Sequence, residues 1–320
     1  MLRGIVALVA LALCLVAGRL HATVEQVKSP ATQRGELWQT EPAHALEAAL
    51  VEDAADGRLD RHSLLTATLI ASGCVDADQL ATHATPIKAW LDRLAVDPHS
   101  VNSQRERAER LLRRLHDELF IGRYQADCSD LRRLNKSGDY NCVGAAVMYL
   151  AACESAGLTA VPQEMPGHVR CRVWLDGEWI IVEPTCREWF TVMNDKSQMD
   201  RLDVAQELRA VWRDPSQGRV LNLPALVAMI YYNQGLDRLE MRDWPGAVSA
   251  NQKALRLDPA SRTARANLLA IWNNWALQLS ERGEHAEAEE MLRRGLRIAP
   301  EFTTFQLNLG VVKQRQSEKP

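Results

Sequence analysis

The sequence lacks the features that point to a nucleic-acid-binding, nucleotide-binding or metal-dependent protein. Its 38 basic and 41 acidic residues leave a net charge of only −3, so no excess of one sign favours a polyanion or an anionic membrane as partner. It has no Cys-x-x-Cys pair, no phosphate-binding P-loop and no dinucleotide-binding glycine fingerprint. Apart from His21 and His168, the histidines are scattered without metal-ligand spacing. We therefore expect no cofactor, no metal and no nucleic-acid partner.

Aromatic residues are also scarce, at 6%, yet the chain is long enough to bury a substantial core. Its 320 residues correspond to roughly two domains. The 47% of hydrophobic and 25% of charged residues are ordinary for a soluble globular protein, which excludes a disordered chain, a collagen or a disulfide-knot miniprotein. Seven cysteines and nine tryptophans are the less ordinary counts.

The N-terminus has the pattern of a secretory signal peptide over residues 1–22. A charged start at Arg3 is followed by a short apolar stretch, 5–16, and by small residues up to Ala22. Cleavage after Gly18 or after Ala22 fits the pattern, and the bulky Leu13 before Cys14 argues against lipid attachment there. No later segment approaches 18 uninterrupted apolar residues. We expect an exported protein, periplasmic or secreted, with no integral membrane segment after signal removal.

Residues 36–125 are predicted to be helical. Apolar spacing indicates helices over 43–53 and 61–70, separated by the breaker Asp56-Gly57, and over 103–120. The last of these is rich in arginine, but acidic residues lie between the arginines, which favours a solvated helix face over an anion site. Nothing in this region indicates chemistry.

A polar loop, 135–141, runs directly into an alanine-rich helix that begins at Cys142. Unpaired N–H groups and the helix dipole favour an anion at a helix N-terminus, so we expect the pKa of this thiol to be lowered. Position alone also fits a buried structural cysteine. Cys128, Cys153, Cys171 and Cys186 lie nearby in sequence, and export would permit disulfides among them, but their pairing is not predicted.

Three strands are predicted after this helix, over 158–164, 168–175 and 178–185. Asp176-Gly177 predicts a type I′ turn that pairs Leu175 with Glu178. In this register His168 and Glu183 share one face as a diagonal pair, with backbones about 7–8 Å apart, a gap that a side-chain hydrogen bond can close.

Arg170 lies on that same face, where it either pairs with Glu183 or contacts the substrate. Trp174 and Trp179 are predicted to pack across the hairpin. The pattern offers a nucleophile, a base and an orienting acid in Cys142, His168 and Glu183.

These motifs resemble the transglutaminase-like core of the papain-type cysteine enzymes. The resemblance covers residues 126–190 and rests on Asn141-Cys142, Gly167-His168 and the run 173–185 that ends in Glu183-Pro184-Thr185. It implies that Cys142 is the nucleophile, His168 the base and Glu183 the orienting acid, although the family usually has aspartate at this last position. The implied reaction is acyl transfer on peptide or glutamine amides, by a protease, a deamidase or a cross-linking enzyme. The alternative is a non-catalytic scaffold with a relic core.

The C-terminal third contains an internal repeat. Residues 231–236 align with 272–277, and Asp258-Pro259 aligns with Ala299-Pro300 at an offset of 41. The pattern resembles tetratricopeptide repeats, helix pairs with a usual period of 34. The repeats are either a helical prop or a surface that binds a protein partner.

The sequence as a whole thus predicts an α+β protein. It comprises the signal peptide, a helical region over 36–125, a transglutaminase-like core with an antiparallel sheet over 126–215, and tetratricopeptide-like repeats over 225–316.

Overall fold

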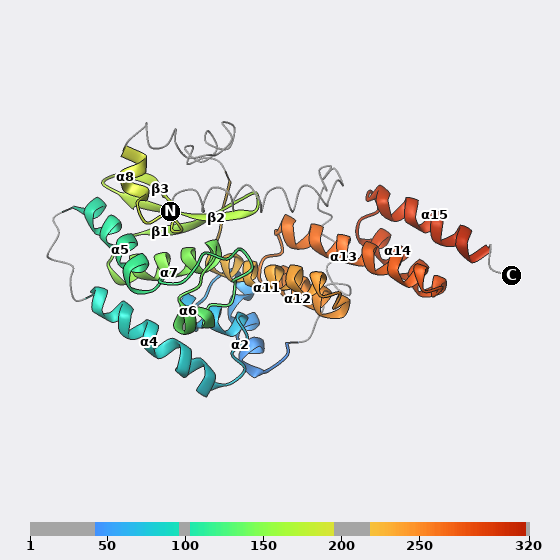
Figure 1. Cartoon of the computed structure of the whole chain (residues 1–320), viewed down its shortest axis with the longest axis horizontal. Helices are drawn as coiled ribbons and strands as arrows, with labels where there is room; N and C mark the ends of the chain where they lie inside the picture. Colours follow the sequence, from blue (N-terminus) through green and yellow to red (C-terminus); the bar gives the residue numbers. More distant parts are fainter. Residues whose placement is uncertain (1–41, 96–102, 195–217, 318–320) are drawn as a thin grey trace. The chain divides into compact units, whose positions relative to one another are not determined.

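The computed structural model describes residues 42–95, 103–194 and 218–317, so the predicted signal peptide lies outside the described residues (Figure 1). Helices predominate, and one four-stranded antiparallel sheet accompanies them, which agrees with the α+β class. The chain forms two compact units, whose described residues divide between Ile230 and Tyr231. This division lies inside α11 (Leu223–Glu240).

The first unit begins with the three helices predicted individually, α2 (Ala45–Asp53), α3 (Leu64–Ala71) and α5 (Gln104–Glu118). A short 3₁₀ turn (Ala54–Asp56) and α4 (Ala77–Ala95) lie between them in the sequence. Ser63 and Ser103 cap α3 and α5, because their side chains accept hydrogen bonds from backbone N–H groups of the first turn. Helix α5 buries Ala108, Leu111, Leu112 and Leu115 along one stripe.

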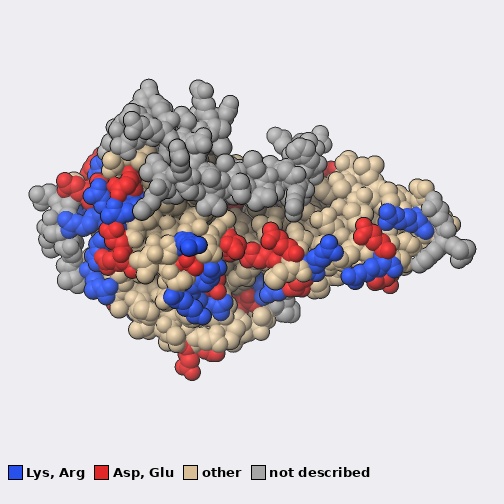
Figure 2. Space-filling view, in the orientation of Figure 1, with Lys and Arg blue, Asp and Glu red and all other residues tan. Residues whose placement is uncertain are grey.

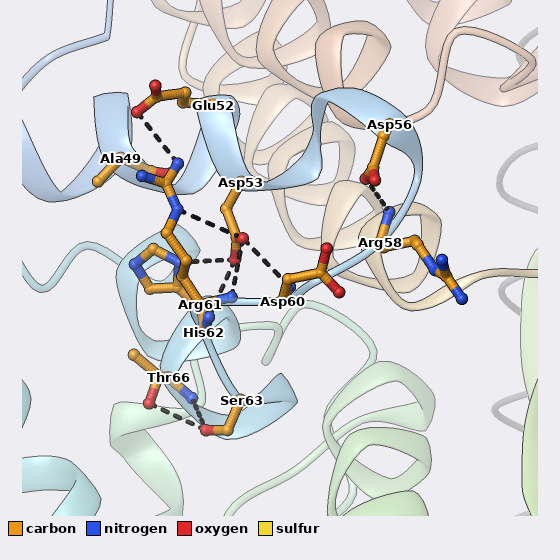
Figure 3. A network of polar contacts seen from close by, with 10 residues as sticks. All are labelled: Ala49, Glu52, Asp53, Asp56, Arg58, Asp60, Arg61, His62, Ser63 and Thr66. Atoms are coloured by element: carbon orange, nitrogen blue, oxygen red, sulfur yellow. Dashed lines mark hydrogen bonds and ion pairs between the residues drawn. The ribbon is translucent and has the colours of Figure 1, made fainter.

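A buried carboxylate organises the loop between α2 and α3 (Figure 3). Asp53 accepts backbone hydrogen bonds from Asp60, Arg61 and His62 at 2.9–3.1 Å, and its Oδ2 accepts a bond of 2.8 Å from His62 Nδ1. Arg61 also forms an ion pair with Glu52. One carboxylate therefore accepts hydrogen bonds from three successive residues of the loop.

Helix α7 (Cys142–Ser155) is the central element of this unit, and the short α6 (Arg132–Ser137) precedes it. It contacts α3, α4 and α5 as well as strands β1 and β2 (Figure 1). Every residue from Val143 to Cys153 is buried. Its glycine and alanines allow neighbouring elements to approach closely, as a helix buried on all sides requires.

The sheet has the order β3-β2-β1-β4, with strands β1 (Ala160–Met165), β2 (His168–Leu175), β3 (Glu178–Val182) and β4 (Arg219–Val220). The predicted hairpin is confirmed: Leu175 pairs with Glu178 and Trp174 with Trp179. Asp176 and Gly177 have φ angles of 52° and 95°, as a type I′ turn requires.

Three strand boundaries were wrong. The first strand covers Ala160–Met165 instead of 158–164, and the third ends at Val182 instead of Thr185. The third strand stops because Pro184 has no N–H to donate, and because the Glu183 carboxylate accepts the Thr185 N–H in a turn.

Strand β3 lies at one edge of the described sheet. There the indole of Trp189, at the start of α8 (Trp189–Asn194), donates a hydrogen bond of 2.7 Å to the Ile181 carbonyl. Trp174 and Trp179 pack edge to face with ring centroids 5.5 Å apart, as predicted for a cross-strand pair.

The second unit contains the end of α11 and four further helices: α12 (Trp244–Leu257), α13 (Arg262–Glu281), α14 (His285–Ile298) and α15 (Thr303–Ser317). Helix α12 packs on α13, α13 on α14 and α14 on α15, and α15 also contacts α13. Ala247 and Ala288, which correspond at the 41-residue offset, are both fully buried.

No described helix combines the length and the apolar character that crossing a membrane requires. On the face drawn in Figure 2, basic and acidic side chains lie close to one another, in keeping with the small net charge.

Candidate active site

The start of α7 is held in place by the side chain of Asn141. Its Oδ1 accepts the Gly144 N–H at 3.0 Å, while its Nδ2 donates to the Ala126 carbonyl and to Ser129 Oγ at 3.2 and 2.8 Å. The residue is 1% exposed, so these bonds replace contacts with water. Asn141 therefore caps the helix and ties its first turn, with Cys142, to the preceding loop.

A second segment runs beside this loop and brings Tyr124 to the site. Tyr124 and Tyr140 form a parallel backbone bridge, and the Gln125 N–H donates to the Tyr140 carbonyl. Gly122 and Gly138 make this approach possible, because a Cβ on Gly122 would lie 2.4 Å from the Ser137 carbonyl and Gly138 has a φ of +70°.

The predicted hydrogen bond between the histidine and the acid is present. His168 Nε2 lies 2.6 Å from Glu183 Oε2, and the two residues are 7% and 3% exposed. The other carboxylate oxygen, Oε1, accepts bonds from the hydroxyl and the N–H of Thr185. A carboxylate accepts only, so Nε2 carries the proton and Nδ1 is the ring nitrogen left for Cys142.

The Cys142 thiol lies beside the His168 side chain and the Val169 N–H. Burial acts to raise the pKa of Cys142, but the charge of His168 and the polar contacts with these two groups outweigh it, and the pKa lies below the ordinary thiol value. Burial acts to lower the pKa of His168, but the charges of Glu183 and Cys142 raise it well above the ordinary value.

Burial likewise acts to raise the pKa of Glu183, and its bonds to His168 and Thr185 lower it below the ordinary value. These directions favour a thiolate, an imidazolium and a carboxylate side by side.

The other five cysteines of the described residues show the opposite shift. Burial raises the pKa of each, to about 11 for Cys128 and Cys186 and to about 12 for Cys153. Cys74 and Cys171 are raised as well. All six described cysteines are free thiols, so there is no disulfide among them. This answers the question of pairing that the sequence left open. Cys142 is the thiol of this set that is prepared for reaction.

Sequence reasoning missed Tyr124. Its hydroxyl lies beside Cys142, and burial, followed by the charges of Cys142 and Glu183, raises the pKa of Tyr124 well above its ordinary value. The phenol therefore stays protonated and can donate. No periodic pattern marks this residue, because it lies in an irregular loop 18 positions before the cysteine.

Arg170 has a different contact from the two predicted for it. Its Nε donates to Gln163 Oε1 on β1 at 2.8 Å, and the residue is 2% exposed. This bond joins β2 to β1 within the sheet.

In the described ranges, no three or more histidine, cysteine, aspartate or glutamate side chains gather as a metal site. The chain matches no known family model, and no curated protein or solved structure is detectably similar to it.

Proposed function

We propose that the protein is an exported transglutaminase-like thiol enzyme that transfers the acyl group of a peptide or glutamine amide through a cysteine thioester. The observation that carries the proposal is the contact of Cys142 with His168, which is itself held by Glu183 at 2.6 Å. This set combines an activated nucleophile, a proton carrier and an orienting acid. Export rests on the sequence of residues 1–22 alone.

The first half-reaction forms the thioester. The Cys142 thiolate attacks the amide carbonyl carbon, and the C–N bond of the resulting tetrahedral adduct then breaks. His168, as imidazolium, gives its proton to the departing nitrogen, which leaves as ammonia or an amine. Glu183 keeps the imidazole in the orientation that this transfer needs.

The second half-reaction releases the acyl group. Neutral His168 takes a proton from the acceptor, which attacks the thioester carbonyl, and the C–S bond breaks to restore the thiolate and the imidazolium. Water as acceptor gives hydrolysis or deamidation, and an amine gives a cross-link.

Two donors are proposed to stabilise the oxyanion of the adduct. The backbone N–H of Cys142 belongs to the first turn of α7, where N–H groups have no intrahelical partner. The Tyr124 hydroxyl already contacts the thiol and stays protonated, so it is our candidate for the second donor.

Thiol alkylation tests the proposal without knowledge of the substrate. The rate of iodoacetamide modification at each cysteine is measured near pH 6 by peptide mass spectrometry, for the wild type and for His168→Ala. We expect Cys142 to react much faster than the other thiols, and the substitution to slow it by roughly 100-fold or more. The buried Cys153 in the same samples is the internal control. Equal Cys142 rates in the two proteins would contradict the enzyme proposal and favour the non-catalytic scaffold.

The acceptor is identified by a second experiment. The protein is incubated with casein, with and without a primary amine, and ammonia, new peptide termini and cross-links are followed. New termini indicate a protease, ammonia alone a deamidase, and amine incorporation a cross-linking enzyme. The Cys142→Ser variant should give none of these products.

The helices α11 to α15 are proposed as a tetratricopeptide-like unit that supports the core or binds a protein partner. Its support is the sequence repeat together with the matching burial of Ala247 and Ala288.

A further inference from the structure

His116 lies in the last turn of α5, outside the set of residues that contact the thiol. Its Nε2 is 2.9 Å from the carbonyl oxygen of Pro184, the residue that directly follows Glu183. A carbonyl accepts only, so Nε2 carries the proton and donates it to this bond. The contact reaches across 68 positions of the sequence to the turn that carries the acid.

The His116 ring is also fixed on its other sides. It packs edge to face against Phe120 and Tyr140, with centroids 5.2 and 5.9 Å away. Phe120 and Tyr140 stack on each other at 4.4 Å, and Tyr124 packs against Tyr140 at 5.8 Å. The same imidazole therefore touches the turn of the acid and the aromatic side chain that precedes Asn141 and Cys142.

A second contact joins the same two segments. Arg187 forms a two-point ion pair with Asp117 of α5 at 2.9 and 3.0 Å. Both side chains are about half exposed, so this pair is expected to contribute little. The bond from the partly buried His116 is the better anchor, because losing it leaves the Pro184 carbonyl without that donor.

We infer that His116 is a positioning residue for the acid of the site: by holding the Pro184 carbonyl, it fixes the Glu183 carboxylate at the distance that orients His168. This inference rests on the proposed function of the site. When the turn is free to shift, the bond of 2.6 Å between Glu183 and His168 lengthens and the imidazolium loses stabilisation. The thiolate of Cys142 then loses its positive neighbour.

The test is the pH dependence of Cys142 alkylation by iodoacetamide in the full chain, from pH 5 to pH 10. His116→Phe keeps an aromatic ring and removes the donor. We expect the pH at which the Cys142 rate reaches half its plateau to rise by about one unit, so that the rate falls roughly tenfold at pH values below both midpoints. The difference should vanish near pH 10, where the thiol is ionised in both proteins. A rate loss of the same size at every pH would overturn the inference, as would an unchanged profile.

A double-mutant cycle asks whether His116 acts through Glu183. In the Glu183→Ala background, His116→Phe should cause no further loss, because the group it positions is absent. Multiplicative losses would show an independent effect and overturn the inference. His62→Phe, which removes a different imidazole hydrogen bond of the same unit, is the matched control and should leave the Cys142 profile unchanged.

A second pair of variants serves if the phenylalanine variant does not fold. A glutamine amide reaches the position of Nε2, whereas an asparagine is too short. His116→Gln should keep the wild-type profile and His116→Asn should lose it. Similar profiles for these two variants would contradict the role. If His168→Ala leaves Cys142 unaffected, the proposed function fails; if it slows Cys142 but His116→Phe does not, only this inference fails.

Discussion

At the scale of single residues, the site is distinguished by the pKa of one cysteine among the six described. Six described cysteines share one unit, yet the pKa shift of Cys142 is opposite in sign to that of the other five. Burial alone would raise the pKa of all six, and a charged His168 reverses its effect at one position. The lowered pKa of Cys142 is therefore due to His168, and substitution of His168 should abolish it.

Tyr124→Phe tests the second oxyanion donor. The substitution removes one hydroxyl and keeps the ring that packs on Tyr140. We expect kcat on an amide substrate to fall by roughly 10²-fold with little change in KM, because the lost bond forms mainly in the transition state. Steady-state kinetics measures both constants. A rise in KM at constant kcat would instead indicate that the hydroxyl binds the ground-state substrate.

The sequence predicted those parts of the site that lie on regular elements, because a strand determines the direction in which each side chain points. The two-residue turn and the alternation of a strand place His168 and Glu183 on one face, and the hydrogen bond between them follows. Tyr124 and His116 could not be found in this way. One lies in an irregular loop, and the other appears in the sequence as one more polar residue on a solvated helix. Their contacts are made by tertiary packing, which leaves no local pattern.

At the scale of elements, the loop between α2 and α3 is stabilised mainly by one carboxylate (Figure 3). Burial acts to raise the pKa of Asp53, but bonds from the His62 ring and from the backbone N–H groups of Arg61, His62 and Asp60 outweigh it. The pKa is held well below the usual carboxyl range. Because the folded state favours the charged form, this stabilisation is present above the ordinary carboxyl pKa and is lost as the pH falls below it.

Asp53→Ala should destabilise the protein by roughly 2–4 kcal/mol at pH 7, because it leaves backbone N–H groups without their acceptor. Urea unfolding of the two proteins between pH 3 and pH 7 measures the difference. We expect the gap to narrow below about pH 4, because Asp53 gains a proton there in the unfolded chain while it stays charged in the folded one. A gap that is constant over this range would show that the charge of Asp53 is not what stabilises the loop.

Helices were easier to predict than strand ends. Apolar spacing located α3 and α5 to within a few residues. The end of β3 was missed because Glu183, which fits a strand by its spacing, uses its side chain to close a turn with Thr185. The same turn is what places the carboxylate beside His168.

At the scale of the whole molecule, the described chain is stabilised without covalent cross-links, although the sequence predicts export to a compartment where disulfides can form. We expect the thermal unfolding midpoint to change by less than about 2 °C when a reductant is added. A single disulfide worth roughly 2–4 kcal/mol would shift it by several degrees. Differential scanning calorimetry with and without reductant is the measurement. A clear fall on reduction would show that a disulfide forms in solution.

The hydrogen bond of the Trp189 indole also affects whether a strand of another chain can pair with the edge of this sheet. An edge strand normally offers its free carbonyls to any extended segment, including a second copy of the same strand. On β3 the Ile181 carbonyl is already bonded to the indole, so a new strand would have to displace a buried tryptophan before it could pair there. Strand addition at Ile181, and sheet-to-sheet aggregation through it, are therefore disfavoured.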